Sequence, residues 1–492
     1  MARITLAVVG IALAVFAIMG AVLRATSQRS VEVGNNTLVS APALLDANNS
    51  PSLAQNPRRP QNLALSYRVD RLRFSAALAW TDDGGTTWQR TALPLPDGKD
   101  RPFGPDVAFG PDGTLYVTYV NLEGTGNVPA NLWVSTSGDG GRTLSPPVLV
   151  AGRLTFQARM AVAPSGTVHV TWLQGSEVGL FKLTGSPNPI VSASSTDGAR
   201  TFSPVVTVSD PERERVGAAS PVIDSNGRLV VLYQDFKGDR RDFENLDGPP
   251  WDEPFSLVFT HSSDGGRSFA KGVEFESGMV PTRRFLVFLP VFPSLASASD
   301  GSLYAAWSDG RNGDEDVFIR RSGDGGRTWE PPVRVNENPM GDGTDQYLPR
   351  VAVSPSGRVD VVFFDRRQDP QNVMTDVTVA WSHDRGRSFD AHRVASQPFD
   401  SRVGPSLDPK FGVDFGSRLA LVSGDGPSVA AWTDSRNGTV DTGRQDVLAT
   451  TFEIPAPPGG LATIPVIAIL LVLSVAAFAG SRLAGRSSLR GP

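Results

Sequence analysis

The sequence predicts an all-β fold in which small antiparallel sheets repeat along the chain. Three observations support this prediction. A turn motif occurs six times, its copies are nearly evenly spaced, and the segments between the copies alternate apolar and polar residues. Such alternation is the period that a half-buried β-strand requires. One unit of this size cannot bury its own faces, so neighbouring units must pack against one another.

The motif is clearest in the octet Ser322-Gly-Asp-Gly-Gly-Arg-Thr-Trp329. Its aspartate can accept N–H groups within the turn, its glycines supply positive φ angles, and its closing aromatic residue can enter the core. Successive central acids lie 56, 58, 67, 60 and 60 residues apart. They are Asp83, Asp139, Asp197, Asp264, Asp324 and Asp384. An enzyme needs one site and not six, so we interpret these aspartates as structural.

The six octets resemble the Asp boxes of the sialidase-like β-propellers, whose repeats are also called BNR repeats. The pattern Ser-x-Asp-x-Gly-x-Thr-Trp is specific when it is repeated, and here it covers residues 51–453. The departures are small: Ala199 replaces the second glycine of one copy, and Arg385 replaces the first glycine of another. The resemblance implies a β-propeller of four-stranded blades and a function that involves glycans.

Residues 51–453 can be divided into seven units of this kind, without a long amphipathic helix pattern between them. The turns between first and second strands, such as Ala163-Pro-Ser-Gly166, have the residues of hairpin loops. One unit shows the design most clearly. Its strands are expected at 350–355, 359–364, 376–381 and 392–395.

The last unit, residues 411–454, has three strands and no box. Residues 31–40 contain one short alternating segment, which could supply the missing strand and join the two ends of the ring. We therefore predict seven blades over residues 51–453, with residues 30–50 as a linker and ring-closing strand. A six-bladed ring with one accessory unit is the alternative, because the sialidase relatives have six blades.

Two apolar segments flank the predicted propeller. Ile4–Leu23 is uncharged over 20 residues and Leu461–Ala479 over 19, and about 20 apolar residues span a bilayer. Residues 1–29 are interpreted as either a cleaved signal peptide or a membrane anchor. Residues 461–480 are interpreted as a transmembrane helix.

A Pro/Gly-rich spacer at residues 454–460 separates the propeller from this helix. Residues 481–492 form a basic tail with three arginines. Basic residues flank the cytoplasmic end of a membrane span. We therefore expect the tail to be cytoplasmic and the propeller to lie on the extracytoplasmic side of the cell membrane.

Composition argues against several other functions. Acidic and basic residues are interspersed and the net charge is -5, so no nucleic-acid partner is expected. The chain has no cysteine, which excludes thiolate metal sites and a cysteine nucleophile. The four histidines fall within strands or beside boxes, and no glycine-rich phosphate loop opens a helix. We therefore expect no cofactor.

Loops between the second and third strands are long and charged, and such loops on a rigid scaffold commonly bind ligands. The largest is Gln234–Pro254. In three others an aspartate stands two residues before an arginine, which predicts either a local ion pair or a binding group. The candidate ligand-binding residues are Asp235, Arg240, Arg241, Trp251, Arg311, Arg367 and Arg436. Asp309, Asp314 and Asp316 are solvated loop acids or a calcium site.

The resemblance to sialidases implies an arginine cluster for a substrate carboxylate, a tyrosine nucleophile and an acidic aspartate. The Phe/Tyr-Arg-Ile-Pro signature of the family is absent. Arg159 and Arg350 begin inner strands and could face the central axis, with Arg284 as a third arginine. Tyr347, two residues after Asp345, is the best nucleophile candidate. Alternatively, Tyr347 and Arg350 close the mouth of the channel structurally.

Two classes of function remain. We favour a recognition module that binds a carbohydrate or a surface protein, because recognition needs only charged and aromatic loops on one face. The alternative is an exo-α-sialidase or related glycoside hydrolase that acts on cell-surface or extracellular glycans. Catalysis needs convergent arginines and a paired acid. The missing arginine signature predicts an incomplete clamp.

Overall fold

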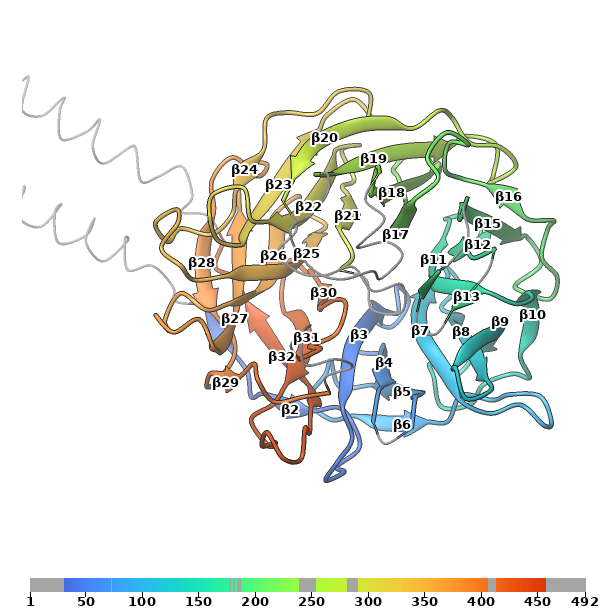
Figure 1. The fold of residues 1–492 in the computed structure, drawn as a ribbon, viewed down its shortest axis with the longest axis horizontal. Helices are drawn as coiled ribbons and strands as arrows, with labels where there is room; N and C mark the ends of the chain where they lie inside the picture. Colours follow the sequence, from blue (N-terminus) through green and yellow to red (C-terminus); the bar gives the residue numbers. More distant parts are fainter. Residues whose placement is uncertain are drawn as a thin grey trace, which may run out of the picture. The chain divides into compact units, whose positions relative to one another are not determined.

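The chain divides into two units, one of residues 33–452 and one made of its two ends, 1–32 and 453–492. The first unit is a β-propeller, in which seven antiparallel sheets surround a common centre (Figure 1). The predicted all-β class and the number of blades are therefore confirmed. The computed structural model describes residues 31–71, 73–176, 178–179, 182–183, 187–238, 254–280, 291–405 and 413–456.

Blades are numbered in chain order, and each runs outwards from an inner first strand. Blade 1 comprises β3 (Asn48–Gln55), β4 (Leu63–Val69), β5 (Ser75–Thr81) and β6 (Gln89–Thr91). Blade 2 comprises β7 (Pro102–Phe109), β8 (Leu115–Glu123), β9 (Val128–Ser137) and β10 (Val148–Ala151). Blade 3 comprises β11 (Thr155–Val162), β12 (Val168–Gln174), β15 (Ile190–Ser195) and β16 (Val206–Thr207). Blade 4 comprises β17 (Val216–Ile223), β18 (Leu229–Asp235), β19 (Phe255–Ser262) and β20 (Val273–Met279).

The remaining blades follow the same order of strands. Blade 5 comprises β21 (Ser294–Ser297), β22 (Leu303–Asp309), β23 (Asp316–Ser322) and β24 (Val333–Arg334). Blade 6 comprises β25 (Gln346–Val353), β26 (Val359–Asp365), β27 (Met374–Ser382) and β28 (Asp390–Arg393), with β29 (Phe399–Asp400) beside β27. Blade 7 comprises β30 (Ala420–Val422), β31 (Ser428–Asp434) and β32 (Asp446–Glu453), with β1 (Glu32–Val33) and β2 (Thr37–Leu38). A small sheet of β13 (Val178–Gly179) and β14 (Lys182–Leu183) lies in the loop of blade 3.

Blade 7 contains strands from both ends of the propeller unit. Strand β2 pairs antiparallel with β32, so that Thr37 lies opposite Ala449 and Leu38 opposite Leu448. The N–H of Val39 donates to the carbonyl of Val447 at 2.9 Å. The early residues therefore occupy the outer edge of the last blade, where they cover backbone groups of β32 that would otherwise be unpaired.

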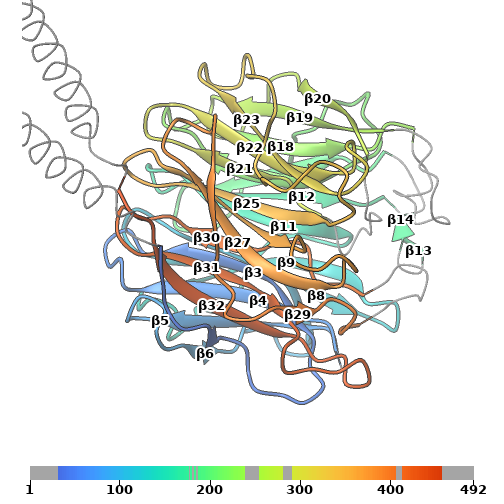
Figure 2. The ribbon, with the colours of Figure 1, turned by 90° about the vertical axis from the view of Figure 1, so that its left-hand side faces the viewer.

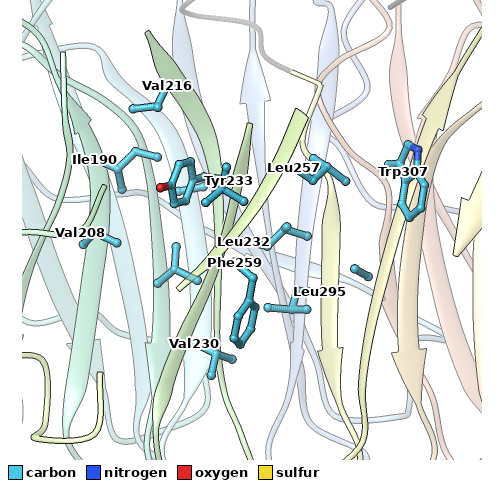
Figure 3. Close-up of a cluster of buried hydrophobic side chains, with 14 of the residues drawn as sticks. Ile190, Val208, Val216, Val230, Leu232, Tyr233, Leu257, Phe259, Leu295 and Trp307 are labelled. Atoms are coloured by element: carbon cyan, nitrogen blue, oxygen red, sulfur yellow. The ribbon is translucent and has the colours of Figure 1, made fainter. Parts of the chain in front are cut away.

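The core consists of apolar layers between neighbouring blades. One cluster of buried side chains extends through three blades and includes Ile190 of blade 3, Leu232 and Leu257 of blade 4, and Leu295 and Trp307 of blade 5 (Figure 3). All five are nearly or completely buried. Since each blade is flanked by two such layers, the alternating residues of its strands are covered on both faces. This arrangement holds the inner strands rigidly around the centre.

Successive strands of a blade are antiparallel, so the connecting turns alternate between two faces of the propeller. The octet turns and the turns between first and second strands share one face. Loops between second and third strands, including β13 and β14, lie at the other face (Figure 2). The described residues include no helix long and apolar enough to cross a membrane. The segments Ile4–Leu23 and Leu461–Ala479 lie outside those residues.

Candidate arginine site at the centre of the propeller

Five inner strands share one irregularity near the start of the strand. Their pairing shifts by one residue, and within each shift stands a residue with positive φ. Such a bulge re-aims the side chain that follows it. The residues with positive φ are Ser50, Gly104, Gln157, Ala218 and Leu348. The side chains two positions later are those of Ser52, Asp106, Arg159, Ser220 and Arg350.

Blade 7 repeats this spacing, because Gly416 has a φ of 89° and Arg418 follows two residues later. Burial and then the nearby charge of Arg159 lower the pKa of Arg350 to about 10. Burial, together with the charges of Arg159 and Arg350, also lowers the pKa of Arg418 well below its usual value. Arginines that influence one another from blades 3, 6 and 7 must converge on the centre of the ring. The structure thus places Arg350 within reach of the charge of Arg159.

The three central arginines differ in their partners. Arg159 forms an ion pair with Asp106, at 2.9 Å between Nη1 and Oδ1. Arg418 donates to the carbonyl of Pro105 at 2.6 Å, while its buried Nε has no hydrogen-bond partner among the described residues. Arg350 forms no hydrogen bond or ion pair with a described residue. The cluster therefore has positive charge that the described protein groups do not neutralise.

A small space beside Arg418 is bordered by aromatic rings. The guanidinium of Arg159 lies 5.1 Å from the ring centre of Phe292, and that of Arg418 lies 5.9 Å from it. The adjoining space is about 40 Å³ and is also lined by Phe103, Phe156 and Ser417. This volume is little more than that of one water molecule. It suits a single small group of a ligand rather than a whole sugar ring.

A fourth arginine, Arg68, lines the same space and joins two carboxylates. Its Nη2 lies 2.7 Å from Oδ2 of Asp70 and 2.8 Å from Oδ2 of Asp414. Burial raises the pKa of Asp414 to about 6, even though the charge of Arg68 opposes the increase. An aspartate with this pKa can donate or accept a proton near neutral pH.

Tyr347 is not exposed to a ligand, as a catalytic nucleophile would need to be. Its side chain is completely buried and its ring packs against Phe364. Its hydroxyl accepts a hydrogen bond from Arg366 at 3.1 Å, and Arg366 in turn pairs with Asp345. These contacts agree with the structural alternative for Tyr347. Arg284 lies outside the described residues.

The predicted ligand-binding residues that are described mostly form local ion pairs. Arg311 pairs with Asp309 at 2.6 Å, Arg367 with Asp365 at 2.7 Å and Arg436 with Asp434 at 2.7 Å. Each pair closes the turn that follows the second strand of its blade. Asp235 is buried and is paired with Arg213. Arg240, Arg241 and Trp251 lie outside the described residues.

The three candidate calcium ligands do not form a common site. Asp309 accepts from Trp307 as well as Arg311, Asp314 accepts the N–H of Gly343 at 2.8 Å, and Asp316 accepts from Asn336 at 2.6 Å. No group of three or more acidic or histidine side chains placed to hold a metal occurs in the described part of the chain. The carboxylates instead serve as hydrogen-bond acceptors within loops.

The octet aspartates tie their turns together in one repeated pattern. In the fifth octet Asp324 accepts the hydroxyl of Ser322 at 2.9 Å and both the N–H and the hydroxyl of Thr328, at 2.9 and 2.6 Å. Partial burial favours the neutral acid, but these hydrogen bonds outweigh it and lower the pKa of Asp324 to about 2. The same contacts occur at Asp83, Asp139, Asp197, Asp264 and Asp384.

Comparisons with known proteins bear on the fold. No family model matches the sequence, and no curated protein matches it. An ulvan lyase, which is a polysaccharide lyase, has a TM-score of 0.50 at 12% identity, over 84% of this chain and 95% of that chain. A Hadza microbial sialidase has a TM-score of 0.43 at 16% identity, over 80% and 74%. An α-L-arabinofuranosidase from Fusarium graminearum has 0.44 at 13%, over 68% and 92%. At these identities the similarity concerns the fold alone.

Sequence reasoning missed three members of the central site. Arg418 follows a glycine in a unit that lacks an octet, so its alignment with Arg159 and Arg350 was not evident. Asp106 stands two residues after Gly104, and the shared spacing from a bulge residue is the signal that could have found both. Asp414 meets Arg68 across 346 positions of sequence, for which no local signal exists.

Proposed function

We propose that the propeller recognises an acidic glycan and that the arginines at its centre hold a carboxylate of this ligand. The observation that carries the proposal is the mutual proximity of Arg159, Arg350 and Arg418, with Arg418 lining a space for one small group. Arg350 has no partner among the described residues. Hydrogen bonds between guanidinium and carboxylate groups are charge-assisted and directional, so a ligand carboxylate would compensate the buried charge.

A protein of similar fold supports the choice of an acidic sugar as the ligand. The ulvan lyase of similar fold was solved with a bound fragment containing GlcA, a sugar acid. That fact concerns the lyase, and for this chain it supports only the class of ligand. Recognition is favoured over hydrolysis here because Tyr347 is completely buried and is held by Arg366.

The proposal can be tested by calorimetry on the full-length protein in detergent. The probes are sialyllactose and a trimer of galacturonic acid, with the methyl ester of the trimer as the uncharged control. We expect Arg350→Gln to weaken binding of the acidic probes at least tenfold, because a charge-assisted hydrogen bond contributes about 1.5–3 kcal/mol. Arg402→Gln is the matched control, since Arg402 is exposed and pairs locally with Asp400. Equal binding of the methyl ester would contradict the proposal.

A glycoside hydrolase is the second candidate, and Asp414 is the observation that favours it. An acid with a pKa of about 6 beside an arginine cluster is typical of a proton donor in glycan cleavage. We expect no release of fluorophore from a fluorogenic sialoside by the purified protein. Hydrolysis that is lost in Asp414→Asn or in Tyr347→Phe would favour the enzyme instead.

We further propose that the propeller is held on the extracytoplasmic side of the cell membrane. The support is the sequence: two apolar segments flank the propeller, and arginines follow the second segment. Protease added to intact cells should digest the propeller. Protection that ends only on lysis would reverse the proposed orientation.

A further inference from the structure

Three consecutive blades contain the same unusual pair of side chains. Where the second strand ends and the third begins, two aspartates lie directly opposite each other and are almost completely buried. Like charges at such positions destabilise a sheet unless cations or hydrogen-bond donors compensate them. The pairs are Asp309 with Asp316 in blade 5, Asp365 with Asp376 in blade 6, and Asp434 with Asp446 in blade 7.

Blades 5 and 7 close their pairs in the same way. Asn312 donates to Asp316 at 2.6 Å, and Asn437 donates to Asp446 at 2.9 Å. Each asparagine stands three residues after the first aspartate of its pair, in Asp-Gly-Arg-Asn and Asp-Ser-Arg-Asn. The turn thus folds its asparagine back over the second carboxylate. An arginine completes each pair.

Blade 6 lacks this asparagine. Gln368 occupies the equivalent position and makes no such bond to Asp376. Oδ1 of Asp376 is buried and has no hydrogen-bond partner among the described residues. Arg393 lies 2.8 Å away, which makes an ion pair without the geometry of a hydrogen bond. Burial raises the pKa of Asp376 more than the charge of Arg393 lowers it.

The aspartate pair of blade 6 faces a pocket. This pocket has a volume of about 510 Å³, and its lining includes Gln368, Met374, Asp376, Thr378, His392 and Arg393. Pockets of this size accommodate small ligands. It lies at the face that carries the loops between second and third strands, on the outer strands of blade 6, and so it is separate from the central arginines.

We propose that this pocket in blade 6 binds a sugar residue through two adjacent hydroxyl groups. One hydroxyl would donate to the carboxylate of Asp376, and its neighbour would accept from the guanidinium of Arg393. Alternating donors and acceptors suit a diol better than an anion, which the three carboxylates of the lining, Asp365, Asp369 and Asp376, would repel. A metal ion is disfavoured because no three ligands converge in the described residues. The proposal goes beyond the acidic-glycan site, because it concerns uncharged sugar hydroxyls.

The experiment uses the full-length protein in detergent with methyl α-mannoside, methyl β-galactoside and methyl α-rhamnoside as separate probes. Saturation-transfer NMR and calorimetry measure binding. Gln368→Asn should close the pair as asparagine does in blades 5 and 7, and we expect it to weaken binding of the preferred glycoside at least tenfold. Asp376→Asn should have a similar effect. The control Lys271→Gln should leave the affinity unchanged, because Lys271 is exposed and pairs with Glu212 outside blade 6.

Several results would overturn the proposal. One is that none of the three glycosides binds. Another is that Gln368→Asn, which is expected to fold because it copies its neighbours, leaves the affinity unaltered even if Asp376→Asn is unstable. Binding of putrescine in place of the glycosides, with loss in Asp376→Asn, would assign the pocket to amines. The acidic-glycan site fails separately, since its readout is the effect of Arg350→Gln on the acidic probes.

Discussion

Two arginines at equivalent positions of different inner strands should respond oppositely to substitution. Arg159 neutralises Asp106, which is 3% exposed, so Arg159→Gln leaves a buried carboxylate without its cation. We expect it to lower the free energy of unfolding by about 3 kcal/mol. Arg350 lacks a described partner, and its charge is disfavoured by burial. Arg350→Gln should therefore leave stability unchanged within about 0.5 kcal/mol, or raise it.

Urea unfolding of the two variants measures this difference. A loss of stability in Arg350→Gln as large as that in Arg159→Gln would mean that Arg350 has a structural partner. The comparison is useful because the two substitutions are chemically identical. A buried charged side chain that lowers the stability of the fold, as expected for Arg350, is typical of a ligand-binding residue.

A second prediction at this scale concerns the pH dependence of Asp414. Burial raises its pKa to about 6 in the folded protein, whereas an unfolded aspartate has a pKa near 3.9. A raised folded pKa stabilises the fold below the unfolded value, and this contribution is lost as the pH rises through about 6. The stability of Asp414→Asn relative to wild type should therefore increase between about pH 4 and pH 7.

Thermal unfolding of Asp414→Asn and wild type between about pH 4 and pH 7 tests whether their difference in stability changes with pH in the predicted direction. Asp425→Asn is a control of opposite sign, because hydrogen bonds from Ser356 lower the pKa of Asp425. The stabilising contribution of Asp425 is present above the unfolded pKa and is lost as the pH falls. A difference between wild type and Asp414→Asn that is constant with pH would contradict the raised pKa.

At the scale of the element, the octet turn depends on where its glycines lie. Gly326 has a φ of 90°, and a Cβ there would lie 2.1 Å from Cε1 of Phe259 in the preceding blade. Gly265 has a φ of 77° and no atom within 4 Å of an added Cβ. We expect Gly326→Ala to cost about 3 kcal/mol or more, and Gly265→Ala about 1 kcal/mol from backbone strain alone.

Chemical denaturation of both alanine variants gives the two values. Ala199 shows that one octet already accommodates a methyl group at the position of the second glycine, with a φ of 65°. The cost at Gly326 therefore comes mainly from contact with the neighbouring blade. Equal losses of stability in Gly326→Ala and Gly265→Ala would show that glycine is required at position 326 because of backbone strain and not because of packing between blades.

The strands and turns of the blades could be predicted from the sequence, whereas the bulges in the inner strands could not. Blades were predictable because each octet marks the turn between a third and a fourth strand, and hairpin turns mark the rest. The bulges in the inner strands were not, since a bulge depends on the register against a partner strand. Arg159 and Arg350 were found because the sequence pattern placed them near the start of inner strands, although β11 begins at Thr155 and β25 at Gln346. Arg418 and Asp414 needed the three-dimensional contacts.

The Asp-x-Arg theme illustrates the same limit at the loops. The local ion pairs of Arg311, Arg367 and Arg436 follow from a spacing of two residues. The difference between blade 6 and its neighbours depends on whether a third residue reaches across to the next strand. A glutamine in place of an asparagine looks conservative in the sequence, but Gln368 does not reproduce the hydrogen bond to the second aspartate of the pair.

At the scale of the whole molecule, the propeller is closed by hydrogen bonds between its two chain ends. Val39 is completely buried, packs with residues of blades 1 and 7, and donates its N–H to Val447. The hydroxyl oxygen of Ser40 accepts the N–H of Val447 at 3.1 Å. Without these contacts β32 would be an exposed edge, and exposed edges pair with other chains.

Val39→Pro and Val39→Ala separate the hydrogen bond from the side chain. Both lose apolar contacts, which should cost about 2 kcal/mol, but only proline also removes the N–H that pairs with Val447. We expect Val39→Pro to be less stable than Val39→Ala by about a further 1 kcal/mol, the value of one hydrogen bond, because the N–H of Ser40 still donates to the carbonyl of Val447 at 3.4 Å. It should also form dimers through the freed edge of β32. Thermal unfolding and light scattering measure both effects, and equal stability with a monomeric proline variant would show that the early strand does not close the ring.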